Sequence, residues 1–118
     1  MLDRDQIITS VERRDGISVL AVSGKIDAAT AAVLDAAIAR VLQLARTPLV
    51  IDLSAVTYLA SAGLRILVAT QKAVGNDFAV VAQSPATRRP IEITRLDELL
   101  VLYPTLDEAL TAMRPNAD

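Results

Sequence analysis

Two kinds of hydrophobic pattern alternate along the chain and predict alternating strands and helices. Short apolar runs rich in β-branched or aliphatic residues, typical of strands, occupy residues 7–11, 17–22, 49–51, 78–82 and 99–102. Between them, apolar residues recur every three or four positions and predict helices over residues 30–44 and 62–74, one after residue 84 and one from residue 106. The predicted order is therefore ββαβαβαβα.

Turn-forming residues set the expected ends of the strands. The Arg-Arg-Asp-Gly sequence at 13–16 predicts a hairpin between the first two runs, and Gly24 is expected to end the second. Pro48 is expected to open the third strand. The turn-prone Asp-Leu-Ser sequence at 52–54 follows that strand and leads away from it.

Capping residues set the expected ends of the first two helices. Either Asp27 or Thr30 can cap the first helix, and the sequence leaves both possibilities open. Ser61 falls at the predicted N-cap of the helix over 62–74, and Gly75 with the following asparagine ends it.

Capping residues and prolines also define the expected starts and lengths of the last two helices. Ser84 suits an N-cap and Pro85 the first helical position, while Pro90 requires this helix to be short or kinked. Thr105, with Glu108 three residues later, matches a capping box at the start of the final helix.

Strands that alternate with helices predict an α/β fold, a small, largely parallel sheet with right-handed crossovers that place helices against it. The 118 residues suffice for one domain, 1–118, with a core over about 7–113 and loose tails at 1–5 and 114–118. Hydrophobic residues make up 53% and aromatic residues only 3%, so the core is expected to be aliphatic. No uncharged stretch reaches the ~18 residues of a membrane span, and no secretory signal precedes the domain, which favours a cytoplasmic location.

Composition argues against catalysis and against nucleic-acid binding. The chain has no histidine and no cysteine, which removes the commonest general base, metal ligand and thiol nucleophile, and neither lysine lies in a Ser-x-x-Lys spacing. Twelve basic and fourteen acidic residues give a net charge of −2, with no evident cationic face. We therefore expect a binding protein that is not an enzyme, needs no cofactor or metal, and acts on other proteins.

Ser61 is the strongest candidate for a functional residue. Its neighbours Ala60, Ala62 and Gly63 are small and leave the hydroxyl little cover. The positive end of the helix dipole would accommodate a phosphate there. The simpler alternative is that Ser61 only caps the helix.

A resemblance makes the functional interpretation more specific. Residues 52–64 read Asp-Leu-Ser-x-Val, one threonine, then Tyr-Leu-Ala-Ser-Ala-Gly-Leu. This segment resembles the signature of the anti-sigma factor antagonists, members of the STAS domain family. Gly-Lys-Ile-Asp at 24–27 and Ser-Pro-Ala at 84–86 resemble two further turns of the family, so the similarity extends over about residues 7–113. Ala60 departs from the family's usual Asp, and Lys25 replaces its common Glu.

The resemblance implies a phosphorylation switch in bacterial partner-switching control of transcription. The unphosphorylated protein is expected to bind an anti-sigma factor with a serine-kinase ATPase fold, which frees the sigma factor. That partner would phosphorylate Ser61 with ATP and Mg²⁺, and a serine phosphatase would reverse the reaction. The expected partner-binding residues are Asp27, Thr57, Tyr58, Ala60, Ser61, Ala62, Gly63 and Arg65.

Other roles remain open at this point. Another STAS function, as a scaffold or transporter-associated subunit that is never phosphorylated, is the nearer alternative. Asp27 is as well suited to capping a helix as to binding a partner, and surface exposure alone would account for Arg65. A nucleotide binder that uses the N–H groups at Ala62 and Gly63 lacks a Gly-rich phosphate loop, and an esterase lacks a histidine.

Overall fold

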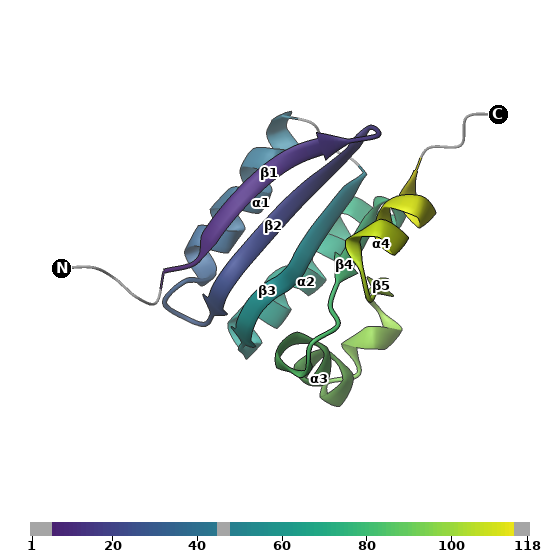
Figure 1. The fold of residues 1–118 in the computed structure, drawn as a ribbon. Helices are drawn as coiled ribbons and strands as arrows, with labels where there is room; N and C mark the ends of the chain where they lie inside the picture. The colour runs from purple at the N-terminus through teal and green to yellow at the C-terminus, as the bar shows by residue number, and fades with distance from the viewer. Residues whose placement is uncertain (1–5, 45–47, 115–118) are drawn as a thin grey trace.

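A mixed β-sheet forms the middle of the protein (Figure 1). The computed structural model describes residues 6–44 and 48–114, and the expected tail segments 1–5 and 115–118 lie outside them. Within the described residues the sheet has five strands in the order β1 (Ile8–Arg14), β2 (Ile17–Ile26), β3 (Leu49–Leu59), β4 (Phe78–Val81) and β5 (Leu102–Tyr103). β1 and β2 are antiparallel, and every other neighbouring pair is parallel.

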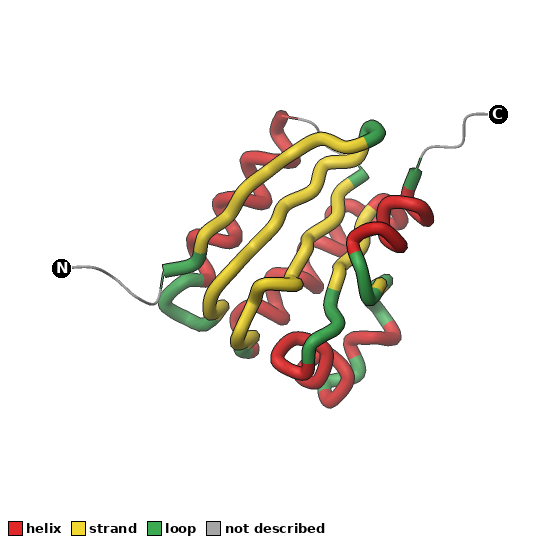
Figure 2. Tube along the Cα trace, in the orientation of Figure 1, coloured by secondary structure: helices red, strands yellow, loops and turns green. Residues whose placement is uncertain are grey.

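Four α-helices flank this sheet on two sides in the described part of the chain. They are α1 (Ala31–Leu44), α2 (Ser61–Val74), α3 (Pro85–Ile93) and α4 (Leu106–Met113). α1 and α2 lie behind the sheet in the view of Figures 1 and 2, and α4 lies in front of it. The predicted order ββαβαβαβα and the largely parallel sheet with helices packed against it are confirmed. The antiparallel pairing of β1 with β2 makes this sheet mixed.

The two faces of the sheet carry separate, mainly aliphatic clusters. The larger cluster joins the sheet to α1 and α2 and includes Leu34, Leu53 and Leu67. The smaller one packs α4 against the other face through Ala109 and Leu110. All four residues of β4 are buried, as expected for a central strand with helices on both sides.

β3 is much longer than the sequence indicates. The predicted strand was 49–51 with a turn at 52–54, but β3 runs without interruption from Leu49 to Leu59. Its buried residues Leu53, Val56 and Leu59 are three positions apart, because the pairing with β2 shifts register twice. Three-residue spacing is not the alternation that identifies a strand, so the second half of β3 was missed.

The hairpin and β2 also differ from the prediction. β1 covers residues 8–14 and not 7–11, and the turn contains only Asp15 and Gly16, both at positive φ of 55° and 81°. Gly24 does not end β2, which continues to Ile26. Gly24 has φ +104° beside one of the register shifts, a backbone conformation that glycine adopts readily and residues with a Cβ atom rarely adopt.

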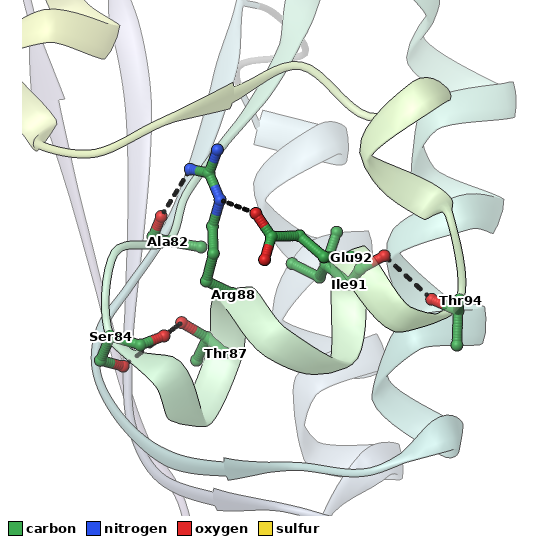
Figure 3. Close-up of polar contacts among 7 residues, drawn as sticks. All are labelled: Ala82, Ser84, Thr87, Arg88, Ile91, Glu92 and Thr94. Carbon is green, nitrogen blue, oxygen red and sulfur yellow. Dashed lines mark hydrogen bonds and ion pairs between the residues drawn. The ribbon is translucent and has the colours of Figure 1, made fainter.

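α3 is short, as Pro90 required, and it is fixed to the end of β4 (Figure 3). The Arg88 guanidinium donates one hydrogen bond to the Glu92 carboxylate at 3.2 Å and another to the Ala82 carbonyl at 3.2 Å. Ser84 is the N-cap, as predicted, although its side chain makes no capping hydrogen bond. Arg88 therefore anchors α3 within the fold.

The segment after α3 folds differently from the predicted strand 99–102. A 3₁₀ turn, η2 (Leu96–Glu98), follows α3, and Leu100 is buried outside any strand. β5 contains only residues 102 and 103. Thr105 is confirmed as the N-cap of α4, because the Glu108 N–H donates to its hydroxyl at 3.1 Å. The Glu108 carboxylate accepts from the Thr105 hydroxyl at 3.3 Å, so the predicted capping box forms only its N-cap half.

Candidate functional site

The carboxyl ends of β2 and β3 meet at one edge of the sheet and bring the predicted site residues together. The two strands are parallel, and Ile26 pairs with Leu59 at their ends. The Ala60 N–H then donates to the Ile26 carbonyl at 2.8 Å. Asp27 and Ser61 each follow directly, so segments distant in sequence converge on this edge.

Ser61 is the first residue of α2, which corrects the prediction that it is the N-cap. The N-cap is Ala60, in an extended conformation with φ −91° and ψ 173° and no side-chain capping bond. The Ala60 carbonyl accepts hydrogen bonds from the N–H groups of Gly63 at 3.0 Å and Leu64 at 3.2 Å, which defines the start of the helix. Ser61 is exposed, and its hydroxyl makes no hydrogen bond to any described residue. The hydroxyl is therefore available at the helix N-terminus.

Gly63 has a packing role at the base of the site. A Cβ atom at this position would lie 2.6 Å from Ile26 Cγ2 and 2.7 Å from Leu59 Cδ1. Only glycine lets the first turn of α2 approach the ends of β2 and β3 this closely. Gly63 is buried, so it supports the site from below rather than presenting a surface to a partner.

Asp27 holds the start of α1, and Thr30 shares this task. The Asp27 carboxylate accepts hydrogen bonds from the N–H groups of Ala29 at 2.9 Å and Thr30 at 3.1 Å. The Asp27 N–H donates to the Thr30 hydroxyl at 3.0 Å, and that hydroxyl donates to the Lys25 carbonyl at 2.8 Å. The two candidate caps are thus parts of one network, and half-buried Asp27 has a structural function whatever else it does.

The remaining predicted residues lie near Ser61 in the chain, at the end of β3 and the start of α2. Thr57 and Tyr58 are exposed near the end of β3, and Tyr58 is paired with Lys25 of β2. Arg65 is exposed one helical turn after Ser61, on the same side of α2. Ala62 is half-buried.

A groove along α2 was missed by sequence reasoning. It has a volume of about 440 Å³, and its lining includes Ser61 and Arg65 of the predicted site. The other lining residues are Leu64, Val68, Ala69 and Lys72 of α2 and, after α3, Thr94 and Leu96. The helical spacing of 61, 65, 68 and 72 places these four on one side of α2, but the opposite wall depends on how the segment after α3 folds back.

The described residues offer no metal site, because no three carboxylate side chains among them gather closely enough to bind an ion. Nor does any helix in residues 6–44 and 48–114 combine the length and apolar character needed to cross a bilayer. What the edge does present is one exposed hydroxyl at a helix start, a nearby guanidinium and a partly apolar groove. These groups are suited to binding and to carrying a phosphate.

Comparison with known families identifies the class to which this arrangement belongs. The sequence model of the STAS domain matches residues 9–109, and the chain belongs to the STAS domain family. This confirms the resemblance inferred from the motifs around Ser61.

Individual relatives make the comparison more specific. The chain is 46% identical over 112 residues to the anti-sigma-F factor antagonist RsfB of Mycobacterium tuberculosis, covering 93% of this chain and 92% of that protein. It is 53% identical to an anti-sigma factor antagonist from Mycobacterium paratuberculosis, whose crystal structure superposes with a TM-score of 0.89 over 98% of this chain and 100% of that one. The unphosphorylated anti-sigma factor antagonist SpoIIAA shares the fold, with a TM-score of 0.73 at 18% identity over 94% of this chain and 100% of that one.

Proposed function

We propose that this protein is an anti-sigma factor antagonist that binds its anti-sigma factor while Ser61 carries a free hydroxyl and releases it once Ser61 is phosphorylated. The observation that carries the proposal is the position of the Ser61 hydroxyl: it is exposed, has no hydrogen-bond partner among the described residues, and belongs to the first residue of α2. The names of two relatives, 46% and 53% identical over nearly the whole chain, support the same function.

The local structure explains how a phosphate would be tolerated. The first N–H groups of a helix have no carbonyl partners within it, and the helix dipole adds positive potential at the same place. Arg65 lies four residues after Ser61, at the spacing that lets side chains meet on one helix face. A phosphate on Ser61 would therefore be stabilised by α2, and the fold would remain intact.

The same phosphate would oppose binding of a partner. Phosphorylation adds a charge of about −1.5 to −2 at neutral pH. At an interface formed around a neutral hydroxyl, this charge loses hydration or meets like charge, and each ~1.4 kcal/mol lost weakens affinity tenfold. The switch thus acts on the surface of the protein and not on its stability.

The partner assignments extend this proposal. The anti-sigma factor would have a serine-kinase ATPase fold and would itself phosphorylate Ser61, and a serine phosphatase would restore the hydroxyl. Asp27, Thr57, Tyr58 and Arg65 would form the contact surface around Ser61. All of these proteins would act in the cytoplasm, and the chain itself would bind without catalysing a reaction.

The test compares charge at Ser61 with the same charge elsewhere. Wild type, Ser61→Ala, Ser61→Glu and a control, Ser10→Glu on the exposed part of β1, are used to capture partners from lysate of the native cell. Wild type, Ser61→Ala and Ser10→Glu should retain one kinase-fold ATPase, which Ser61→Glu should lose. The purified ATPase with ATP should then add one phosphate to wild type and none to Ser61→Ala, as measured by intact mass.

Two results would overturn this function. If Ser61→Glu retains the ATPase as well as wild type does, Ser61 is not the switch. If a transporter complex is captured instead, the chain is a transporter-associated STAS subunit, the alternative that Ala60 in place of the usual Asp favours. Circular dichroism of each variant separates a binding effect from loss of folding.

A further inference from the structure

The groove beside Ser61 has the composition of a site for an amphipathic ligand. Its walls are mainly aliphatic, with Leu64 and Val68 of α2 on one side and Leu96 of η2 on the other. Its volume of about 440 Å³ falls within the range of small-molecule pockets. The hydroxyl of Thr94, which also lines it, already donates to the Ile91 carbonyl at 3.1 Å (Figure 3). The Pro90 carbonyl is a second acceptor for this hydroxyl, at 2.8 Å.

The charges that border the groove are both positive. Arg65 and Lys72 lie seven residues apart on α2, two turns along the same side, and both are exposed. Neither forms an ion pair with another residue in the described part of the chain, and no carboxylate is among the lining residues. An anionic group that enters the groove would therefore lie near two cations, with no carboxylate among the lining residues to repel it.

We propose that this groove binds a free, single-chain amphipathic anion, a medium-chain fatty acid or a ligand of the same chemistry. Its carboxylate would pair with Lys72, and its acyl chain would lie along Val68 and Leu64 toward Ser61. At a rise of 1.5 Å per residue, the distance along α2 from Lys72 to Leu64 is ~12 Å, about the length of a chain of ten carbons. This site goes beyond the proposed antagonist function and does not depend on it.

The position of Ser61 links the ligand to the modification site. Ser61 lines the same groove, so a bound acyl chain would cover part of the approach to its hydroxyl. A negative charge at Ser61 would in turn replace an uncharged part of the wall with a hydrated ionic group, which disfavours burial of the acyl chain there. Ligand and phosphate would therefore oppose each other at this site.

Chain length supplies the sharpest test. Hexanoate, octanoate and decanoate are titrated below their micelle concentrations into the full-length protein, with binding followed by calorimetry and by methyl NMR. Affinity should rise about two- to fourfold per added methylene group, fourfold being the value for complete burial. The methyl signals of Leu64, Val68 and Leu96 should shift, while those of Val19 on the other face of the sheet should not.

Variants and a neutral analogue test the recognition of the anion. Decanol should bind more weakly than decanoate, and Lys72→Gln should weaken decanoate binding several-fold without altering decanol binding. Arg40→Gln on α1, which removes a guanidinium from a different exposed surface, serves as the control and should have no effect. Ser61→Glu should weaken decanoate binding.

The proposal fails if binding does not saturate, if affinity does not depend on chain length, or if the shifted methyl groups lie outside the groove. Equal affinity for decanol and decanoate would also overturn it, because the cations would then have no role. If Val68→Gln leaves the protein folded and decanoate binding unchanged but abolishes capture of the anti-sigma factor, the groove belongs to a protein interface instead.

Discussion

Replacing Gly63 with alanine tests the close packing beneath the site. The added Cβ would lie 2.6 Å from Ile26 Cγ2 and 2.7 Å from Leu59 Cδ1, both on buried side chains. Overpacking of this kind costs about 1–3 kcal/mol. Alanine recovers about 1 kcal/mol because of its higher helix propensity. The upper part of the overpacking range applies here, because both contacts are below 3.0 Å, and we expect a net loss of about 1–2 kcal/mol.

Urea unfolding followed by circular dichroism measures this loss. Wild type and Gly63→Ala are compared with Ala73→Gly, which changes helix propensity at an exposed position of the same helix. A second variant, Leu59→Val, lacks the Cδ1 atom. If the contacts are as close as described, Gly63→Ala should cost at least about 0.5 kcal/mol less in the Leu59→Val background than in wild type.

An increase in the free energy of unfolding on Gly63→Ala would refute the packing argument. If Gly63→Ala stabilises the protein by about 1 kcal/mol, propensity alone governs the position and the close approach of α2 is wrong. If it destabilises equally in both backgrounds, Leu59 is not the group that excludes a side chain.

Substitutions at three other positions probe the helix starts. Asp27→Ala should destabilise the protein by about 1–2 kcal/mol in urea titrations, because it removes the acceptor for two backbone N–H groups, and Asp27→Asn, which keeps an oxygen, should cost less. Thr105→Ala should cost about 1 kcal/mol by the same measurement, through loss of the bond from the Glu108 N–H. Ala60→Asp should stabilise the unphosphorylated protein by about 1 kcal/mol. The gain should be smaller when Ser61 is phosphorylated, because the carboxylate and the phosphate would compete for the same N–H groups. An equal gain in both forms would contradict this explanation.

The order of the elements was predictable from the sequence because burial imposes a periodicity on each of them. α2 buries Leu64, Leu67 and Thr70, and this three-residue spacing is visible in the sequence. The continuous apolar run at 78–81 likewise identified a strand covered on both faces. These patterns are local in the sequence, so they can be recognised without knowing which elements pack against one another.

Features that depend on partner strands were not predictable. The second half of β3 owes its strand conformation to pairing with β2, and the register shifts in that pairing remove the alternation from its sequence. Gly24 was assigned as a strand end because nothing local distinguishes a strand irregularity from a turn.

The candidate site likewise has features that were predictable from the sequence and features that were not. Ser61 was found from its motif, but its role as the first helical residue follows from the Ala60 carbonyl, which accepts the first two helical bonds. The opposite wall of the groove was missed because Leu96 belongs to a 3₁₀ turn where the sequence predicted only a segment leading into a strand. The position of such a wall depends on how two segments distant in sequence pack together, and no local sequence pattern predicts that packing.

At this edge of the sheet, the residues that position the backbone differ from the residue proposed to carry the phosphate, so phosphorylation need not weaken the fold. The backbone at Ala60 is held by its bond to the Ile26 carbonyl, and Gly63 fixes the first turn of α2 against the strands. Neither contact uses the Ser61 side chain, which makes no hydrogen bond within the described residues. Asp27 differs, because its carboxylate supports α1. Under the proposed function, a phosphate on Ser61 would therefore change the charge of the surface and leave these backbone and packing contacts in place, so its free-energy cost would fall on binding of the partner.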